Sequence, residues 1–377
     1  MKLVHLADTH LGYRAYGRIT PKGLNIRERD VIKTFKEALD KIAEINPELI
    51  IVAGDVFHRP RPGNTSIYLT IKFLLEFRTR CKAPIVMISG NHEASKTLEN
   101  ENILKIIEAT VPLVKVIDRQ IEQFTLDNLG VSILGIPYNA LNDFDKTSIV
   151  PDSSYKYNIL TIHGSFQGIK SLENEADLIS TDDINASKWD YVALGHYHSY
   201  TKLADNVFYA GSIERTSSNI WREADEPKGF IEYNLNTGKH VFHKLQTPRN
   251  VVDTGKVDVN GLTAEEIDRV IERVVAQIED FDNSMVRITL ENIDNLSIKN
   301  LDYAKIGIYR KRALHFRLNF QKKEDVLEGK RNLPHESRDL LEYIDEDLKN
   351  FELAAGLNRE KFEQMAKSYL VTGGKNV

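Results

Sequence analysis

The sequence has few features of a secreted or membrane-spanning protein. Its 377 residues include one cysteine, Cys81, so no disulfide can form within the chain, and we expect Cys81 to be structural. No apolar run approaches the roughly 18 residues that a membrane helix needs. The first residues predict a strand rather than a signal peptide. We therefore expect a cytoplasmic protein without membrane contact.

The sequence also has only a small excess of negative over positive charge. The formal net charge is −5, and 28% of the residues are charged, which is ordinary for a globular protein. This balance argues against a generic polycation, but it does not exclude local contacts to nucleic acid. A chain of this length is too long to fold around a single hydrophobic core, so we expect two or three domains.

The order of the predicted elements indicates an α/β protein. Strand and helix patterns alternate with short connections up to about residue 135, which is typical of βαβ units. Two apolar runs around 127–130 predict a hairpin, and mostly strand patterns follow to residue 245. We therefore predict a mixed sheet, or two stacked sheets, with helices outside, in a first domain of residues 1–247.

The remaining residues divide into two smaller parts. Residues 248–322 predict a small α+β domain, in which a capping box at Thr263 and Glu266 opens a helix. Strands are predicted there at 286–290, 305–309 and 314–320. Residues 323–377 begin with a charged linker and continue with apolar stripes that predict a C-terminal helical hairpin.

Polar side chains follow five of the predicted strands, at the point where each strand ends. In open α/β sheets this edge is where ligands bind. The residues that fall there are Asp8, His10, Asp55, His58, Asn91, His92, His163, His196 and His198. Six of the eleven histidines are thus found just past a strand, whereas His5, His240, His243, His315 and His335 are not and are expected to be structural.

Seven of these side chains form a plausible ligand set without a thiolate. They are Asp8, His10, Asp55, Asn91, His163, His196 and His198. Such a mixture suits manganese, iron, zinc or magnesium. Seven ligands are too many for one tetrahedral zinc but about right for two octahedral ions. Asp55 is the natural bridge, because a carboxylate has two oxygens to share.

Each motif is weak when taken alone. An isolated Asp-x-His or Gly-Asp is usually a loop, and an isolated His163 would most often be a satisfied buried histidine. The five motifs together favour a metal site, because each follows a predicted strand. Basic residues lie close to the first two motifs: Arg14, Arg18, Lys22, Arg27, Arg59 and Arg61. In a nuclease, such residues would contact DNA phosphates, and an ordinary solvated loop is the alternative.

As a set, these motifs resemble those of the calcineurin-like metallophosphoesterase superfamily over residues 1 to about 245. His58, the segment 211–215 and the appended domain resemble the SbcD-type nucleases of double-strand-break repair. The resemblance implies a four-layer sandwich of mixed sheets flanked by helices. Two residues depart from the usual pattern, because Glu93 stands where Asp is common and Ala210 where Pro is common.

The resemblance also implies roles for the site residues. One metal would be held by Asp8, His10, Asp55 and His198, and a second by Asp55, Asn91, His163 and His196. These would be two Mn²⁺ ions per chain, and His58 and His92 would be catalytic groups that bind no metal.

Partners follow from the same resemblance. Residues 248–322 would cap the DNA, the final helices would bind an SMC-like coiled-coil ABC ATPase, and the chain would form a homodimer. We therefore expect a manganese-dependent DNA exonuclease or endonuclease that processes double-strand-break ends. A phosphatase or phosphodiesterase for proteins or small molecules would use the same ligands. A non-catalytic binding role is disfavoured by the intact ligand set.

Overall fold

The computed structural model describes residues 1–94, 101–143, 149–169 and 178–322. Met1–Lys323 groups into one compact unit, and the fold and the site belong to that unit. The predicted linker from residue 323 and the predicted C-terminal hairpin lie outside the described residues. Within the described ranges, no helix is long and apolar enough to cross a membrane.

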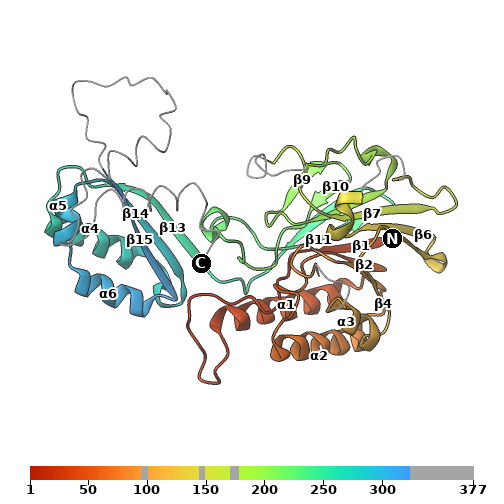
Figure 1. Cartoon of the computed structure of the whole chain (residues 1–377), viewed down its shortest axis with the longest axis horizontal. Coiled ribbons are helices and arrows are strands. Elements are labelled where there is room, and N and C mark those ends of the chain that lie inside the picture. The colour runs from red at the N-terminus through yellow and green to blue at the C-terminus, as the bar shows by residue number, and fades with distance from the viewer. Residues whose placement is uncertain (95–100, 144–148, 170–177, 323–377) are drawn as a thin grey trace, which may run out of the picture. The chain divides into compact units, whose positions relative to one another are not determined.

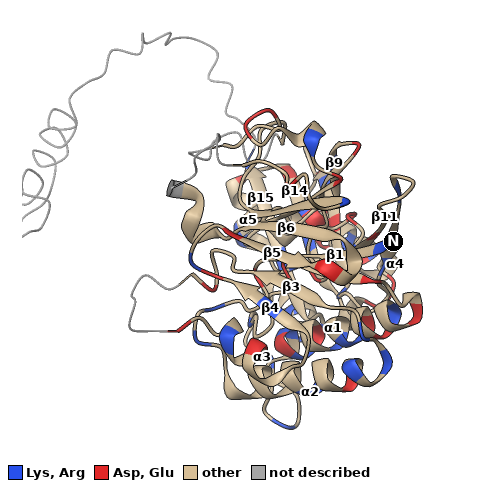
Figure 2. Ribbon diagram, turned by 90° about the vertical axis from the view of Figure 1, so that its right-hand side faces the viewer, with Lys and Arg blue, Asp and Glu red and all other residues tan. Residues whose placement is uncertain are grey.

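The first of two large sheets is mostly parallel. Its strand order is β12-β11-β1-β2-β3-β4, with β1 to β4 parallel and β11 and β12 antiparallel. Three helices cover its outer face (Figures 1 and 2). The strands are β1 (Lys2–Leu6), β2 (Leu49–Ala53), β3 (Ile85–Ile88), β4 (Val114–Ile117), β11 (Gly229–Asn234) and β12 (Lys239–Lys244). The helices are α1 (Ile26–Ile45), α2 (Asn64–Arg80) and α3 (Leu104–Thr110).

Helix α1 shows how the sequence sets these boundaries. The Asn25 side chain accepts hydrogen bonds from two backbone amides of the first turn, and Asn46 ends the helix in the left-handed conformation. Val31, Phe35 and Ile42 are buried against the sheet, as the periodicity predicts. Charges of both signs alternate along α1 and α2 (Figure 2), and ion pairs link neighbouring turns of each helix.

The second sheet stacks on the inner face of the first. Its order is β5-β6-β7-β8-β10-β9, and apolar side chains from both sheets form one buried cluster between them. The predicted hairpin around 127–130 is confirmed, since β5 and β6 pair antiparallel. The strands are β5 (Glu122–Leu126), β6 (Val131–Ile136), β7 (Tyr157–His163), β8 (Tyr191–Gly195), β9 (Thr201–Ala204) and β10 (Val207–Tyr209). The two stacked mixed sheets confirm the predicted fold class.

Short 3₁₀ helices lie in the connections. They are η1 (Asp127–Leu129), η2 (Tyr138–Asp143), η4 (Ala186–Lys188), η5 (Ile220–Glu223) and η6 (Phe281–Asn283). The outer face of the second sheet packs against residues from such connections, among them Phe166, Ile184 and Trp189.

Residues beyond 250 form a three-stranded parallel sheet, β13-β14-β15, with its own apolar cluster. The capping box at Thr263 and Glu266 is confirmed. The strand expected at 305–309 is wrong, because these residues lie in helix α6, capped by Asp302. A short apolar run does not separate strand from helix by itself, and parallel neighbours such as β14 and β15 need a crossover connection. The elements are β13 (Val251–Asp258), α4 (Ala264–Gln277), β14 (Met285–Ile293), α5 (Asn295–Asn300), α6 (Tyr303–Arg312) and β15 (His315–Lys322).

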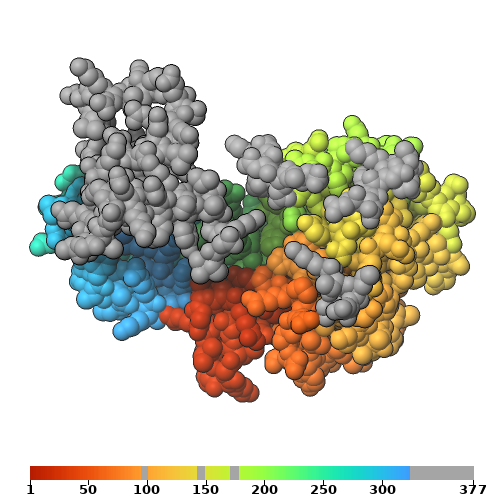
Figure 3. All heavy atoms as spheres, viewed as in Figure 1, coloured from red at the N-terminus to blue at the C-terminus, as the bar shows by residue number. Residues whose placement is uncertain are grey.

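Contacts also join this three-stranded sheet to the residues before it. Ile220 and Trp221 of η5 pack with Val251, Met285 and Leu314 in one buried cluster. The segment between β1 and α1 projects from the helix layer (Figures 1 and 3) and contributes to the same junction. The boundary expected at residues 247–248 stays a prediction.

Candidate metal centre

The carboxyl ends of strands from both sheets meet at one place. The ring nitrogen Nδ1 of His163, at the end of β7, lies 2.8 Å from the carbonyl oxygen of Ala53, at the end of β2. Glycine is required where the two sheets touch. A Cβ at Gly195 would lie 1.8 Å from the Ala53 oxygen, and one at Gly54 would lie 2.2 Å from His163 Nδ1. This close approach brings motifs that are distant in sequence within contact of each other.

Several of the predicted ligands have a strained backbone. Asp8, His10, Asp55 and His196 have φ angles of 50°, 46°, 51° and 102°. Residues with a side chain rarely adopt positive φ, and such conformations cost of order 1–3 kcal/mol each. Strain at four predicted ligands indicates that the fold fixes the directions of these side chains. The surrounding structure must compensate for the unfavourable backbone conformations.

One group of donors contains His10, His198 and Asp8. The Nε2 atoms of His10 and His198 lie 3.0 Å apart, and one carboxylate oxygen of Asp8 lies within 4.8 Å of a ring nitrogen of each. The Asp8 carboxylate also accepts a hydrogen bond from the backbone amide of His196, at 3.0 Å. This amide holds the carboxylate in place while its other lone pairs stay free to bind a cation.

A second group of donors surrounds Asn91. Its Oδ1 lies 3.0 Å from His163 Nε2 and 3.1 Å from His196 Nδ1. Because His163 Nδ1 donates to the Ala53 carbonyl, the lone pair of the neutral His163 ring falls on Nε2, the atom that faces Asn91. This arrangement presents two imidazole nitrogens and an amide oxygen to the same point.

The Asp55 carboxylate lies between the two groups. Its Oδ2 atom is 3.7 Å from His10 Nε2 and 3.5 Å from His163 Nε2, and its Oδ1 accepts from the His92 amide at 2.9 Å. Gly90 leaves room for it, since a Cβ there would lie 2.1 Å from Oδ1. Asp55 therefore contacts ligands of both groups, as a bridging carboxylate must.

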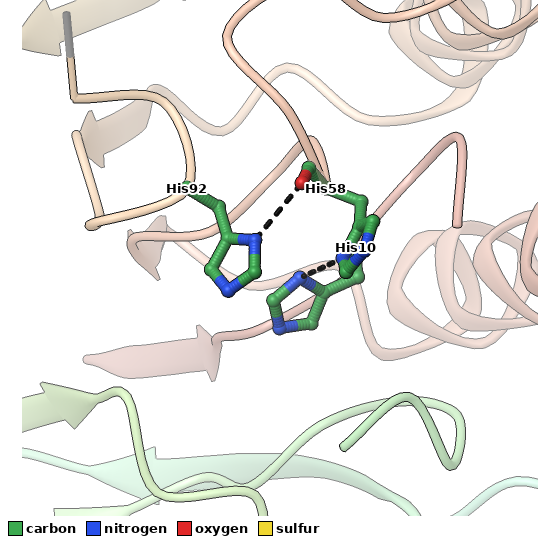
Figure 4. A group of neighbouring side chains, drawn as sticks. All are labelled: His10, His58 and His92. Carbon is green, nitrogen blue, oxygen red and sulfur yellow. Dashed lines mark hydrogen bonds between the residues drawn. The ribbon is translucent and has the colours of Figure 1, made fainter. Parts of the chain in front are cut away.

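The imidazoles of His58 and His92 lie beside His10 (Figure 4). His92 Nδ1 donates to the His58 carbonyl at 2.9 Å, and His92 Nε2 lies 4.0 Å from Asp55 Oδ2. The Nδ1 atoms of His58 and His10 are 3.3 Å apart. The His92 ring is therefore oriented by a backbone carbonyl, with Nε2 directed to the side of the carboxylates.

Burial and mutual charge shift the pKa values of these groups. Burial raises the pKa of Asp8 to about 6 and lowers that of His10 well below its usual value. Burial by itself would lower the pKa of His163, but the Asp55 carboxylate outweighs it and raises this pKa to about 9. In return His163 keeps the Asp55 pKa below its usual range against the effect of burial. Buried carboxylates and imidazoles facing one point are a donor set that fits divalent cations, and a cation bound at His163 would displace its second proton.

The basic residues predicted to contact DNA have different environments. Lys22, Arg59 and Arg61 are exposed. Arg14 is exposed but pairs with Glu28 at 2.6 Å. Arg18 donates to carbonyls at the end of α6, including Arg310 at 3.1 Å and Lys311.

The DNA contact expected of Arg27 is wrong. Its side chain is fully buried between Asp30, at 2.9 Å, and Glu214, at 3.1 Å. It stabilises the interior of the protein instead. Its position at the start of α1, beside a basic loop, gave no indication of this burial.

Sequence reasoning missed three residues that support the ligands. Glu93, noted only as a departure from the usual motif, is buried and accepts from the amides of Phe57, at 2.5 Å, and Gly90, at 3.0 Å. It thereby joins the loops that carry Asp55 and Asn91. Glu223 and Lys228 lie behind His198, and no motif or spacing in the sequence indicates them.

A cleft of about 600 Å³ opens beside the donors. Its wall consists of histidines of the site on one side and of polar residues before and within η5 on the other. The lining includes His10, His58, His92, His196, His198, Tyr13, Thr216, Ser217, Ser218, Asn219 and Arg222. The donors are thus reachable from outside by a substrate with an extended polar surface.

Comparison with known proteins gives consistent matches. A family described as calcineurin-like phosphoesterase matches residues 1–226. A "DNA double-strand break repair protein Mre11" of Methanococcus maripaludis is 32% identical over 61% of this chain and 62% of its own length. A protein of the same name from Archaeoglobus fulgidus is 24% identical over 99% of this chain and 85% of its own length.

A bacterial protein matches a similar share of the chain. This protein of Staphylococcus epidermidis, named as one of the subunits of the nuclease SbcCD, is 29% identical over 61% of this chain and 65% of its own length. The chain spans about three fifths of the length of the Methanococcus maripaludis relative and of a Methanocaldococcus jannaschii relative with the same name. The range matched by the family model, residues 1–226, includes all seven predicted ligands.

Proposed function

The chain belongs to the calcineurin-like phosphoesterases, and on this premise we propose that it is a metal-dependent nuclease that hydrolyses DNA phosphodiester bonds. The observation that carries the proposal is the position of Asp55 between two groups of metal donors. The names of the relatives refer to DNA double-strand break repair and to a nuclease, and they support DNA as the substrate.

Divalent-metal binding is general to this family, and the donor set fits two ions. In the proposal Asp8, His10, Asp55 and His198 hold one, and Asp55, Asn91, His163 and His196 hold the other. We propose Mn²⁺ for both, with Mg²⁺, iron or zinc compatible with the same oxygen and nitrogen donors. When bound, such a pair activates a water and stabilises the attacking and leaving oxygens at phosphorus.

The chain's own side chains would handle the leaving group. His92 is directed to the carboxylates through Nε2, and its Nδ1 is held by the His58 carbonyl. In its doubly protonated form, with Nδ1–H on the His58 carbonyl, it would donate a proton or a hydrogen bond from Nε2 to the departing oxygen, a role typically worth about 10²–10⁴ in rate. The His58 backbone orients this ring, and the His58 ring lies against His10 and the cleft.

DNA would approach the cleft across exposed basic loops. Arg59 and Arg61 follow His58 directly, and Arg14 and Lys22 precede α1. Contacts from such residues position a phosphate backbone without reading sequence. Arg18 would act less directly, because it already donates to the carbonyls at the end of α6. Residues 248–322, which pack beside this loop, would shape the access of DNA to the cleft.

Partners are proposed on the name of one relative and on the apolar stripes of the C-terminal sequence. The Staphylococcus protein is named as one component of a nuclease, which supports a partner protein for this chain too. We propose an SMC-like coiled-coil ABC ATPase bound through residues 333–377, and a homodimer. Deleting residues 333–377 should preserve DNA cleavage and abolish co-purification with the ATPase, and unchanged co-purification would refute this assignment.

The substrate is tested by direct comparison of three phosphoesters. The purified chain with Mn²⁺ is given end-labelled duplex DNA, a phosphopeptide and a cyclic nucleotide at equal concentration. We expect DNA to be hydrolysed fastest, and Asp55→Asn to abolish the reaction. Faster hydrolysis of the phosphopeptide or the cyclic nucleotide would favour the alternative of a phosphatase or small-molecule phosphodiesterase on the same donors.

A further inference from the structure

Behind the His198 ring lies a buried ion pair that the metal ligands do not include. The Glu223 carboxylate lies 3.5 Å from His198 Nδ1 and 2.5 Å from the ammonium of Lys228. The side chain of Lys228 is fully buried and that of Glu223 nearly so. Removing two charges from water is strongly unfavourable unless further contacts compensate for it. Filling space in the interior therefore does not account for this pair.

The remaining contacts of Lys228 also converge on His198. Its ammonium donates to the His198 carbonyl at 2.8 Å and to the Ser212 hydroxyl at 3.0 Å. The Ser212 amide donates to the same carbonyl at 3.0 Å. Glu223 and Lys228 together therefore contact both the ring and the backbone of one metal ligand.

The Glu223 carboxylate faces Nδ1 of the His198 ring. His198 Nδ1 is buried and makes no hydrogen bond within the described part of the chain, and the Glu223 carboxylate lies just beyond that contact, at 3.5 Å. With the proton on Nδ1 and directed at the carboxylate, the lone pair falls on Nε2, the atom that faces His10 at 3.0 Å. The Lys228 ammonium lies against the same carboxylate and pairs with its charge.

The position of Glu223 is fixed from two directions. Arg215 donates to the carbonyls of Glu223 and Ala224, at 2.9 and 3.0 Å. Trp221, two residues earlier in η5, is buried in the cluster with Val251 and lies 5.1 Å from the Arg287 guanidinium. The η5 turn is therefore held by residues 251–314 on one side and presents Glu223 to His198 on the other.

We propose that Glu223 is the positioning residue of the His198 ligand, held in place by Lys228 and by the packing of η5 on the three-stranded sheet. The inference rests on the proposed function, because it requires His198 to bind a metal. Partners behind a ligand histidine fix its tautomer and ring orientation and increase its basicity, and their loss typically lowers metal affinity about 10–100-fold. Neither Glu223 nor Lys228 binds the metal in this assignment; both act through His198.

Metal binding without DNA tests the inference separately from nuclease activity. The full chain is stripped with a chelator and titrated with Mn²⁺, and bound ions per chain are counted after equilibrium dialysis. The parent should bind two ions, and Glu223→Gln should bind one of them about 10–100-fold more weakly. Asp225→Asn, which removes one exposed negative charge from the same segment, should bind both ions as the parent does.

A second variant separates positioning from folding. Glu223→Gln leaves the Lys228 charge buried without its partner, which by itself can unfold a protein. The double variant Glu223→Gln/Lys228→Met removes both charges and keeps the volume. It should unfold at a temperature close to that of the parent and still bind one ion weakly. Its electron paramagnetic resonance spectrum at one to two ions per chain should show an isolated Mn²⁺ where the parent shows a coupled pair.

The outcomes that overturn the inference are distinct from those that overturn the function. If the parent binds two ions and the double variant binds both equally tightly, Glu223 does not position His198, whatever the nuclease activity. If the parent itself binds no divalent ion, the proposed metal-dependent function falls and the inference falls with it. If Asp225→Asn lowers the affinity for one ion as much as Glu223→Gln does, the effect comes from the overall charge of the segment. The assignment to Glu223 is then wrong.

Discussion

The Nε2 atoms of His10 and His198 face each other across 3.0 Å, from strand ends in different sheets. Two imidazole nitrogens at this distance can share one N–H in a hydrogen bond, or they can bind one cation together. Burial lowers the pKa of His10 well below its usual value, so a proton is poorly held there. A divalent cation is the better partner for this pair.

Removal of metal should therefore destabilise the protein. Because the folded chain gathers the donors and the unfolded chain does not, a bound ion stabilises the fold by about 2.7 kcal/mol at 100 times its Kd. We expect the melting temperature to rise with added Mn²⁺ and to fall with a chelator. A scanning calorimetry series over Mn²⁺ concentration checks this, and a melting temperature independent of the metal would contradict it.

Asp55 should matter to both ions at once. Asp55→Ala removes the carboxylate that lies between the two donor groups, so we expect hydrolysis to be lost and more than one ion per chain to be released. Elemental analysis of the dialysed variant measures the loss. Asp205→Ala, at a fully exposed aspartate, serves as the control and should keep both ions. Two ions remaining on Asp55→Ala would show that it is no bridge.

His92 should affect the rate without affecting metal or DNA binding. The His92→Gln variant keeps a side chain of similar length but loses the proton donor, so cleavage should fall by about 10²–10⁴-fold. Metal content, DNA affinity and melting temperature are measured on the same preparation and should match the parent. A variant that cuts DNA at near the parent rate would exclude the catalytic role. If metal content falls together with the rate, His92 instead supports the Gly90 turn.

His5 should make folding sensitive to acid. It is fully buried in β1, with Nδ1 2.9 Å from the Tyr191 hydroxyl, and burial lowers its pKa from 6.5 to about 3. The folded state therefore does not bind a proton that the unfolded state takes up below pH 6.5. The corresponding stability is complete above pH 6.5 and is lost at about 1.4 kcal/mol per pH unit as the pH falls towards 3.

Replacing His5 removes this contribution. Between pH 7.5 and pH 5, the parent should lose roughly 2 kcal/mol more unfolding free energy than His5→Gln does. Urea unfolding of both proteins at the two pH values checks the difference. Equal losses in the two proteins would mean that His5 is protonated, or solvated, in the folded state.

The ligand set could be predicted from the sequence because of the geometry of parallel strands. Asp8, Asp55 and Asn91 follow strands that are neighbours in one sheet, and such strands end at a common edge. The contact of this edge with the end of β7 could not be predicted from one segment alone. It depends on the stacking of two sheets and on glycines at positions 54 and 195.

Other features depended on contacts that sequence patterns do not encode. Lys228 and Glu223 are ordinary charged residues in the sequence, and only the fold places them behind His198. Arg27 belongs to a basic stretch by sequence, yet it is buried because Asp30 and Glu214 neutralise it. The 305–309 segment is a helix because its tertiary position, between two parallel strands, requires a crossover.

The dependence of DNA cleavage on metal occupancy tests the central claim most directly. The stripped chain is loaded with Mn²⁺ in steps, and bound ions and the initial rate of cleavage of end-labelled duplex DNA are measured at each step. If two donor groups share Asp55 and act together, the rate should stay near zero at low occupancy and rise as the second ion binds. A rate unaffected by stripping, or a chain that holds two ions and leaves DNA intact, would contradict the assignment.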